Sequence, residues 1–301
     1  MSQGQPPERG RRESTPPRGR GAPRRDNRGG PRTSRPDAED PGRSLGAPTG
    51  ARTPVGLDRA KARAGALPRP GRESTAPPRP ELPEDEEPQL PKGVRREIDR
   101  VIGRSRRGSD IALALSIGAA AIDEERLDVA LPMLAWVKHE APRIAAVREA
   151  YGVALYLDEQ FAAALSELQA YKRISGQVDQ NHLIADCLRA LDRGVDRIVD
   201  AAAELVHADG APEDRRAEAA IVWASALADD GDVGAGRAVL RAYLQRAGAG
   251  QGEHVLRARY ALAELAARDG DPRDAAEHYR TVLAIDPDFL DVSDRIDALE
   301  A

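Results

Sequence analysis

The sequence predicts an all-α fold built from stacked helical hairpins, and three observations carry this prediction. Related residues recur 34 positions apart, so that Gly118 corresponds to Gly152 and Leu134 to Leu168. A fixed period of this length is typical of proteins that repeat a helix–turn–helix unit. Apolar residues in the last two thirds of the chain recur with helical spacing, and no segment alternates as a strand does. Only 3% of the residues are aromatic, so aliphatic and alanine side chains have to form the core along helices.

Residues 1–90 are predicted to lie outside the helical domain. The first 80 residues are rich in Arg, Pro and Gly and carry 18 basic against 8 acidic side chains. They show no apolar periodicity, so burial of their surface cannot offset the entropy lost on ordering, and we expect a disordered tail. The stretch 81–91 combines an acidic run with three prolines and is expected to form an extended acidic linker. The helical domain then covers residues 91–301.

A first helix is predicted over residues 94–102. A single helical stripe is formed by Val94, Ile98, Val101 and Ile102. This helix is expected to cap the N-terminal end of the array.

Five hairpins are predicted to follow. Their first helices start near Ile111, Ala145, Asp179, Ala217 and Leu256, at spacings of 34, 34, 38 and 39 residues. The extra residues of the two longer spacings fall in 206–215 and 247–253, where a surface loop can lengthen without disturbing the core. A final helix over 289–299 is expected to cover the last hairpin, because the ends of a repeat array have to be capped.

Small residues recur where the two helices of a hairpin should approach closely. They are Gly118, Gly152, Ala224 and Ala263 on the first helices and Ala130, Ala164 and Ala275 on the second. Larger residues fill the remaining space, in a row formed by Leu134, Leu168, Leu240 and Tyr279.

Three residues depart from this packing pattern. At the small-residue position of the second helix, the third hairpin has Ile198 and the fourth has Gly236. Ile198 implies a wider crossing angle between the two helices or a one-residue shift in the alignment. Pro132 requires its helix to begin near Leu127 or Asp128, since a proline deeper in a helix costs about 3 kcal/mol.

The fifth hairpin resembles the tetratricopeptide repeat. The resemblance rests on Leu262-Ala263, on the run Asp269-Gly270-Asp271-Pro272-Arg273-Asp274-Ala275-Ala276-Glu277-His278-Tyr279, and on Ile285-Asp286-Pro287. It covers residues 111 to about 301. The whole chain is similar to bacterial tetratricopeptide-repeat (TPR) proteins with an Arg-, Gly- and Pro-rich N-terminal tail. The implied fold is a helical solenoid of about five hairpins between capping helices, preceded by a disordered tail.

The resemblance implies a concave groove lined by the first helices of successive hairpins, where family members bind protein segments. Carried over by alignment, the lining comprises Glu149, Val153, Tyr156, Gln180, Leu183, Cys187, Glu218, Ser225, Tyr260 and Glu264. Some family members clamp a peptide carboxylate with Lys, Arg and Asn, but the matching positions here hold Leu115, Ala119, Glu149 and Val153. We therefore expect a mixed apolar and acidic groove that suits a basic or amphipathic segment. The alternative is that these residues are ordinary solvated or packed helix faces.

We expect no catalysis, no cofactor and no metal. The five histidines are scattered; His182 and Asp186 share a helix face but lack a third ligand. Cys187 is the only cysteine, so it forms no intramolecular disulfide, and its apolar neighbourhood favours packing over reactivity. No apolar run reaches the roughly 18 residues of a membrane span and no signal peptide is evident. The sequence therefore predicts a cytoplasmic adaptor that binds an unknown protein or peptide partner.

The basic tail supports an alternative function in RNA or ribosome association. Its arginines alternate with glycines, and contacts to a polyanion are expected from Arg9, Arg18, Arg20 and Arg28. Because no aromatic residue interleaves them, such binding should be weak and tolerant of sequence. The tail could equally be a solubilising linker, or it could occupy the acidic groove until a partner displaces it.

Overall fold

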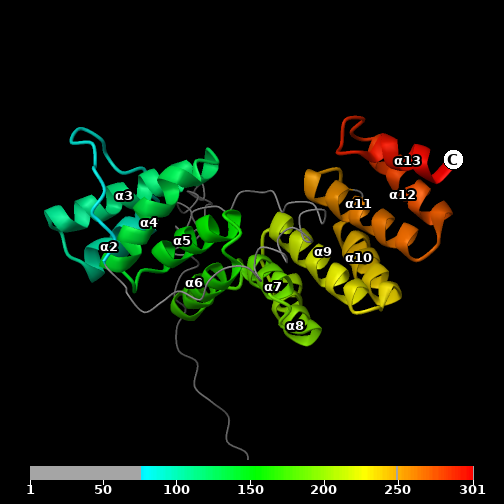
Figure 1. The fold of residues 1–301 in the computed structure, drawn as a ribbon, viewed down its shortest axis with the longest axis horizontal. Coiled ribbons are helices and arrows are strands. Elements are labelled where there is room, and N and C mark those ends of the chain that lie inside the picture. Colours follow the sequence, from blue (N-terminus) through cyan, green and yellow to red (C-terminus); the bar gives the residue numbers. More distant parts are fainter. Residues whose placement is uncertain (1–75, 249, 301) are drawn as a thin grey trace, which may run out of the picture. The chain divides into compact units, whose positions relative to one another are not determined.

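The computed structural model describes residues 76–248 and 250–300, and every regular element within these residues is a helix (Figure 1). Its twelve helices are α2 (Lys92–Val101), α3 (Arg106–Asp123), α4 (Leu127–Glu140), α5 (Ala145–Leu157), α6 (Phe161–Ser175), α7 (Asn181–Ala190), α8 (Val195–Val206), α9 (Glu213–Asp229), α10 (Val233–Ala247), α11 (Glu253–Arg268), α12 (Pro272–Leu283) and α13 (Val292–Glu300). Residues 1–75 of the tail predicted over residues 1–80, with Arg9, Arg18, Arg20 and Arg28, lie outside the described residues.

Five antiparallel hairpins run from α3 to α12, as the sequence predicts. Each first helix packs on the second helix of its own hairpin and on the hairpin or hairpins adjacent to it in the chain. The connections 207–212 and 248–252 are hardly longer than the connection 176–180, so the prediction that the extra residues lengthen surface loops is wrong. The longer spacings are taken up mainly by α9 and α11, which begin earlier relative to the repeat than α7 does. No helix within the described ranges is long and apolar enough to cross a bilayer.

One register of small and large residues recurs in the hairpins. Gly118 packs so closely on its partner helix that an added Cβ would lie 2.7 Å from Cγ of Leu134. At Gly152 the same atom would lie 2.9 Å from the side chain of Leu168. The spacing that the sequence repeats is therefore a helix–helix contact that leaves no room for a side chain.

The third hairpin keeps this register, but on α8 the large and the small side chain have exchanged positions. Ile198 is the fourth residue of α8, as Ala130 is of α4, so the one-residue shift considered from the sequence does not occur. Four residues on, where other hairpins carry a large side chain, α8 has Ala202, and both Ile198 and Ala202 are buried. The helix α4 begins at Leu127, as Pro132 requires.

All five hairpin turns place one residue in the left-handed conformation after the first helix. In the last two hairpins it is glycine, with φ of 103° at Gly231 and 78° at Gly270. In the first three it is Glu125, Glu159 or Asp192, at φ of 57°, 61° and 52°. A non-glycine residue pays a steric penalty there, so the acidic turns are strained positions held by the packing of the hairpins on either side.

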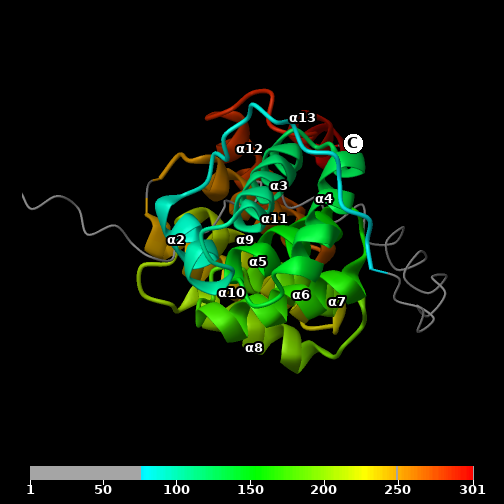
Figure 2. The same ribbon diagram turned by 90° about the vertical axis from the view of Figure 1, so that its left-hand side faces the viewer.

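Both ends of the array are covered. At the C-terminal end, Val292 and Ile296 of α13 close a small core with Tyr279. At the other end, the extended segment 76–91 runs over α3 and leads into α2 (Figure 2). Its Leu82 and Leu90 pack against the main core, and the backbone N–H of Gln89 donates to Oγ of Ser116 at 2.8 Å. The stretch predicted as an acidic linker therefore forms part of the N-terminal cover.

Candidate functional site

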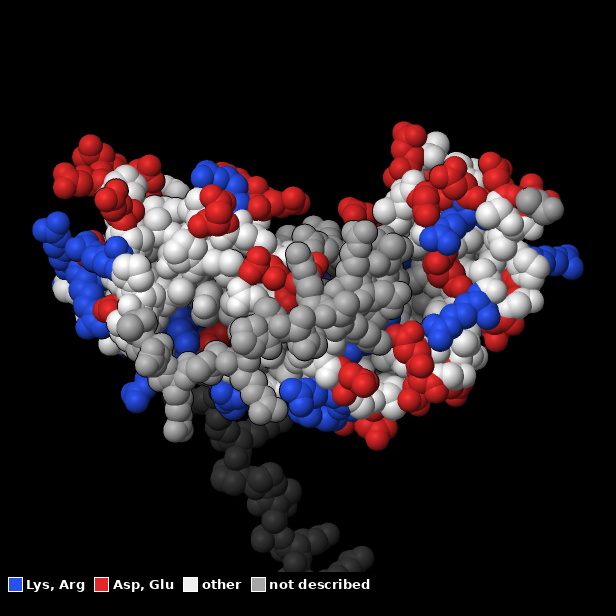
Figure 3. Space-filling model, viewed as in Figure 1, with Lys and Arg blue, Asp and Glu red and all other residues white. Residues whose placement is uncertain are grey.

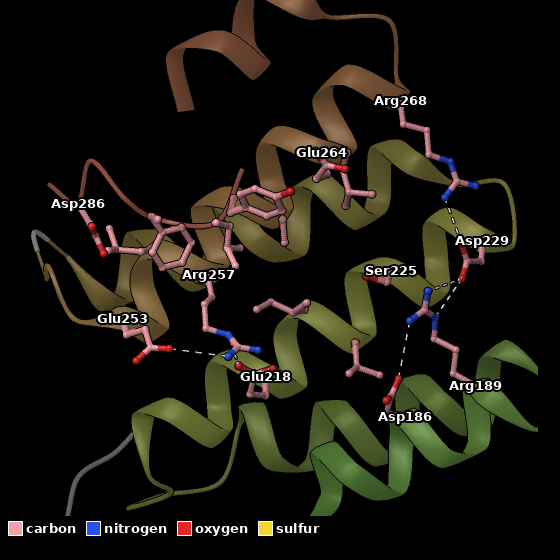
Figure 4. A pocket seen from close by; sticks show the side chains of 18 of the residues that line it. Asp186, Arg189, Glu218, Ser225, Asp229, Glu253, Arg257, Glu264, Arg268 and Asp286 are labelled. Carbon is pink, nitrogen blue, oxygen red and sulfur yellow. Dashed lines mark hydrogen bonds and ion pairs between the residues drawn. The ribbon is translucent and has the colours of Figure 1, made fainter. Parts of the chain in front are cut away.

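A groove of about 870 Å³ is formed by the first helices of hairpins two to five and the segment 285–290 that precedes α13 (Figure 4). It is lined by Tyr156, Glu159, Phe161, Asp186, Arg189, Glu218, Ile221, Val222, Ser225, Asp229, Gln251, Glu253, Leu256, Arg257, Tyr260, Ala261, Glu264, Leu265, Arg268, Ile285, Asp286, Asp288, Phe289 and Leu290. Most of the lining comes from α5, α7, α9 and α11, because in each hairpin the first helix presents a repeating row of residues to this side; Phe161, at the start of α6, adds to it. The volume lies within the range of known ligand sites.

Apolar and aromatic side chains line much of the groove. Tyr156 and Phe161 meet edge to face with ring centroids 5.8 Å apart, and Tyr260 and Phe289 lie with centroids 6.4 Å apart. Leu290 is 54% exposed, although large apolar side chains are otherwise mostly buried in the described chain. Phe161, Tyr260 and Phe289 are themselves buried, so among these residues Leu290 and the partly exposed Tyr156 supply the apolar surface that the groove leaves open.

Carboxylates outnumber cations in the lining by eight to three. The acidic residues are Glu159, Asp186, Glu218, Asp229, Glu253, Glu264, Asp286 and Asp288. Acidic side chains also dominate the C-terminal part of the face shown in Figure 3. The groove is therefore an acidic surface as well as an apolar one.

The three arginines of the lining are already engaged by its own carboxylates, as the dashed lines of Figure 4 show. Arg189 bonds Asp229 at 2.8 Å, and Arg268 reaches the other oxygen of the same carboxylate at 3.1 Å. Arg257 bonds Glu218 at 2.8 Å. These pairs tie α7, α9 and α11 together, and the arginines do not neutralise the carboxylates of the 285–290 segment.

Burial shifts the acidity of two groups in the groove. The hydroxyl of Tyr156 donates to Asp186 at 2.6 Å, and desolvation followed by the charge of Asp186 raises the pKa of Tyr156 well above its usual value. Desolvation also raises the pKa of Glu218 to about 7, against the opposing effect of Arg257. Glu218 therefore titrates near neutral pH, and the negative charge of the groove increases as pH rises through that value.

Five of the residues predicted to line a groove lie in this one: Tyr156, Glu218, Ser225, Tyr260 and Glu264. The other five are buried outside its lining: Glu149, Val153, Gln180, Leu183 and Cys187. Val153, Cys187, Ser225 and Glu264 occupy the same repeat position, which is buried in hairpins two and three and becomes partly exposed in hairpins four and five. Sequence alignment alone does not separate these two environments, because they depend on how neighbouring hairpins pack.

The buried polar pair Glu149 and Gln180 shows what the inner positions do instead. The side-chain amide of Gln180 donates to Glu149 at 2.6 Å, joining α5 to the start of α7. A buried carboxylate needs such partners, so this contact serves the stacking of hairpins two and three.

The segment 285–290 is the part of the site that sequence reasoning missed. The sequence pattern places the end of the last repeat and the start of a cap here, but α13 begins only at Val292. Asp286, Asp288 and Leu290 therefore belong to the groove lining. A signal existed in the run Asp286-Pro287-Asp288, since a proline between two aspartates favours a turn over a helix.

The candidate reactive residues are placed without activation. His182 is buried with Nδ1 3.1 Å from the carbonyl oxygen of Asp179, and desolvation lowers its pKa to about 3. Cys187 has no exposed surface, and desolvation raises the pKa of its thiol well above the usual value. The described ranges contain no cluster of three or more His, Cys, Asp or Glu side chains arranged to hold a metal.

No protein-family model matches the sequence, and no curated protein matches it. Among solved structures, it is similar to YrrB, described as a TPR protein with an unusual peptide-binding site, at 15% identity over 68% of this chain and 98% of that one, with a TM-score of 0.47. It is also similar to TTC0263, a thermophilic TPR protein of Thermus thermophilus, at 18% identity over 62% of this chain and 97% of that one, with a TM-score of 0.48. The five hairpins of the structure itself confirm the helical-repeat architecture that the sequence predicts, and both of these solved structures carry the tetratricopeptide name.

Proposed function

We propose that this protein is a non-enzymatic interaction scaffold whose groove binds a protein segment with basic side chains along an apolar stripe. The observation that carries the proposal is the acidic and apolar lining of the groove, with eight carboxylates against three arginines that are already paired. The ligand is an unknown protein or peptide.

Charge determines which segment fits. The carboxylates of Asp286 and Asp288 lie on a turn at one side of the groove, and neither forms an ion pair among the described residues. An arginine or lysine of the ligand gains an ion pair with them, whereas an acidic ligand meets repulsion. The groove therefore selects for basic partners and against acidic ones.

The aromatic and aliphatic lining provides the apolar part of the binding energy. An amphipathic segment can place its apolar stripe on Leu290 and on the partly exposed Ile221 and Ile285, and direct its basic side chains to the carboxylates around them. Recognition of this kind rests on a few buried apolar anchors surrounded by a charged rim. It needs no chemical step, in keeping with the neutral, buried state of His182 and Cys187.

The test uses the full chain and two labelled amphipathic peptides that share one leucine stripe and differ only in having arginine or glutamate on the polar face. The arginine peptide should bind and the glutamate peptide should not, as measured by fluorescence anisotropy. The variant Asp286→Asn/Asp288→Asn removes two charges yet keeps the oxygen of Asp286 that accepts the N–H of Asp288. Because an exposed ion pair contributes about 0.2–1 kcal/mol, the variant should bind the arginine peptide roughly 2- to 30-fold more weakly.

The matched control is Asp209→Asn/Glu277→Gln, which removes two exposed carboxylates that do not line the groove. It should leave the affinity unchanged. Equal binding of the two peptides, or equal affinity of the groove variant and the control, would refute the proposed function.

A further inference from the structure

The N-terminal end of the helical domain carries a basic surface that the groove does not use. Residues 92–107 carry seven basic and two acidic side chains, whereas residues 108–301 carry 20 basic and 35 acidic ones. We call the seven residues the basic end: Lys92, Arg95, Arg96, Arg100, Arg104, Arg106 and Arg107. They lie on α2, on the connection after it and on the first turn of α3, and basic side chains gather over this end of the molecule in Figure 3.

The positive charge of the basic end is only partly neutralised. Arg104 lies 3.3 Å from Asp99, and Arg107 lies 2.9 Å from Glu140. Arg95, Arg100 and Arg106 are exposed and form no ion pair with any other described residue. The carboxylate of Glu97 is occupied in accepting the backbone N–H of Ala145 at 3.2 Å. A surplus of guanidinium groups therefore remains available on this surface.

The surface is hollowed between α2 and α3, with a volume of about 490 Å³. Arg95, Arg104 and Arg106 line the hollow together with Ser105 and Ser109. Asp99 also lines it, so its three arginines face a single carboxylate, which pairs with Arg104. The Ser105 side chain already accepts the N–H of Gly108, so the attraction for anions comes from the arginines and not from free N–H groups of the helix end. Three arginines around one hollow suit a chain of phosphates, because each guanidinium fork can donate two hydrogen bonds to one phosphate.

The apolar side chains at this end argue against a membrane partner. A helix that binds a membrane surface exposes an apolar face, yet Val94 and Ile98 of α2 are buried against α3 and the core. Val101, 43% exposed, is the single large apolar side chain that stands out from this surface in the described structure. A partner held through charge alone is a better match.

We propose that the basic end binds the phosphate backbone of single-stranded nucleic acid. The proposal is independent of the groove and goes beyond the protein scaffold proposed above. No aromatic side chain lies among residues 92–109, so bases can stack only on guanidinium planes. Binding is therefore tolerant of sequence and strongly dependent on salt.

The test uses the full chain and a labelled oligouridylate of about 16 nucleotides, a length that matches the larger single-strand binding sites. The variant Arg95→Gln/Arg104→Gln/Arg106→Gln removes three charges from the hollow. The control Arg193→Gln/Arg197→Gln/Arg273→Gln removes three exposed arginines elsewhere on the described surface. Losing three phosphate contacts should lower the slope of log affinity against log salt by about 2, whereas the control should keep the wild-type slope.

Crosslinking locates the contact independently of the variants. An oligonucleotide carrying 4-thiouridine should crosslink to the peptide that spans residues 92–109 in the wild type. The proposal is overturned if the variant keeps the wild-type salt slope, if crosslinks fall only outside this peptide, or if the variant loses binding to phosphatidylserine vesicles while its binding to the oligonucleotide is unchanged.

Discussion

Two glycines on the same helix provide a test of how the hairpins interlock. Gly234 and Gly236 are the second and fourth residues of α10. A Cβ built on Gly236 would lie 2.5 Å from the carbonyl oxygen of Ala224 and 3.2 Å from Cδ1 of Leu265. A Cβ on Gly234 would meet only the Asp232 side chain, at an ordinary 3.7 Å. The two glycines thus lie on the same helix but differ in the free space around them.

Replacing each glycine by alanine therefore has opposite expected effects. Alanine is favoured over glycine in a helix by about 1 kcal/mol, so Gly234→Ala should stabilise the fold by roughly 0.5–1 kcal/mol. At Gly236 the added methyl group has to push α9 away, because the atom that it meets belongs to the backbone. Overpacking of this kind costs about 1–3 kcal/mol, which leaves Gly236→Ala destabilised by roughly 1–2 kcal/mol after the gain in helix propensity.

Thermal unfolding followed by circular dichroism measures the difference. The two variants should differ by about 1.5–3 kcal/mol, which corresponds to roughly 3–12 °C in Tm for a domain of this size. Hydrogen exchange should place the loss in Gly236→Ala in α9 and α10, since repeat arrays open locally. If Gly236→Ala were as stable as Gly234→Ala, the close approach of α9 and α10 would not govern the packing of this hairpin.

Two further predictions concern a hairpin turn and the charge of the groove. Glu125→Gly should stabilise the domain by up to about 1 kcal/mol in urea unfolding, because Glu125 is held at a φ of 57°, where glycine escapes the steric penalty; a loss of stability would contradict the strain at this turn. Glu218 has a folded pKa of about 7 against an unfolded value of 4.5, so its contribution is fully present below pH 4.5 and is lost as pH rises through 7, by roughly 3 kcal/mol in all. The variant Glu218→Gln should lack this loss, so the free energy of unfolding of the variant relative to wild type should rise between pH 4.5 and 8. His182, whose pKa is lowered to about 3, weakens both proteins as pH falls below 6.5 and cancels in the comparison. A difference that stays constant with pH would show that Glu218 titrates normally in the folded protein.

The architecture could be predicted because each repeat carries its own packing rule. The pairing of Gly118 with Leu134, repeated at Gly152 and Leu168, fixes a helix–helix contact within a single hairpin. Such a rule depends on residues that are near in sequence, so periodicity is enough to find it. The exchange of a large and a small side chain between Ile198 and Ala202 could not be predicted from the sequence, because assigning these residues to packing positions requires the start of α8.

The groove could be predicted only in part, because it depends on contacts between hairpins. Glu149 and Glu218 are both acidic residues on first helices, yet Glu149 is fixed by Gln180 of the next hairpin and Glu218 faces the groove. Burial of Glu149 is decided by a neighbour 31 residues away. The run Asp286-Pro287-Asp288 marks a turn in the sequence, but the position of this turn beside α11 could not be predicted, because it depends on how α13 closes the last hairpin.

The most direct measurement of the central claim is the location of a bound basic peptide. An arginine-rich amphipathic peptide with a benzophenone on its apolar stripe, irradiated with the full chain, should crosslink to α9, α11 and the segment 285–290, and the crosslinks should be lost in high salt. Crosslinks concentrated on the second helices α10 and α12, or spread evenly over the domain, would contradict binding in the groove.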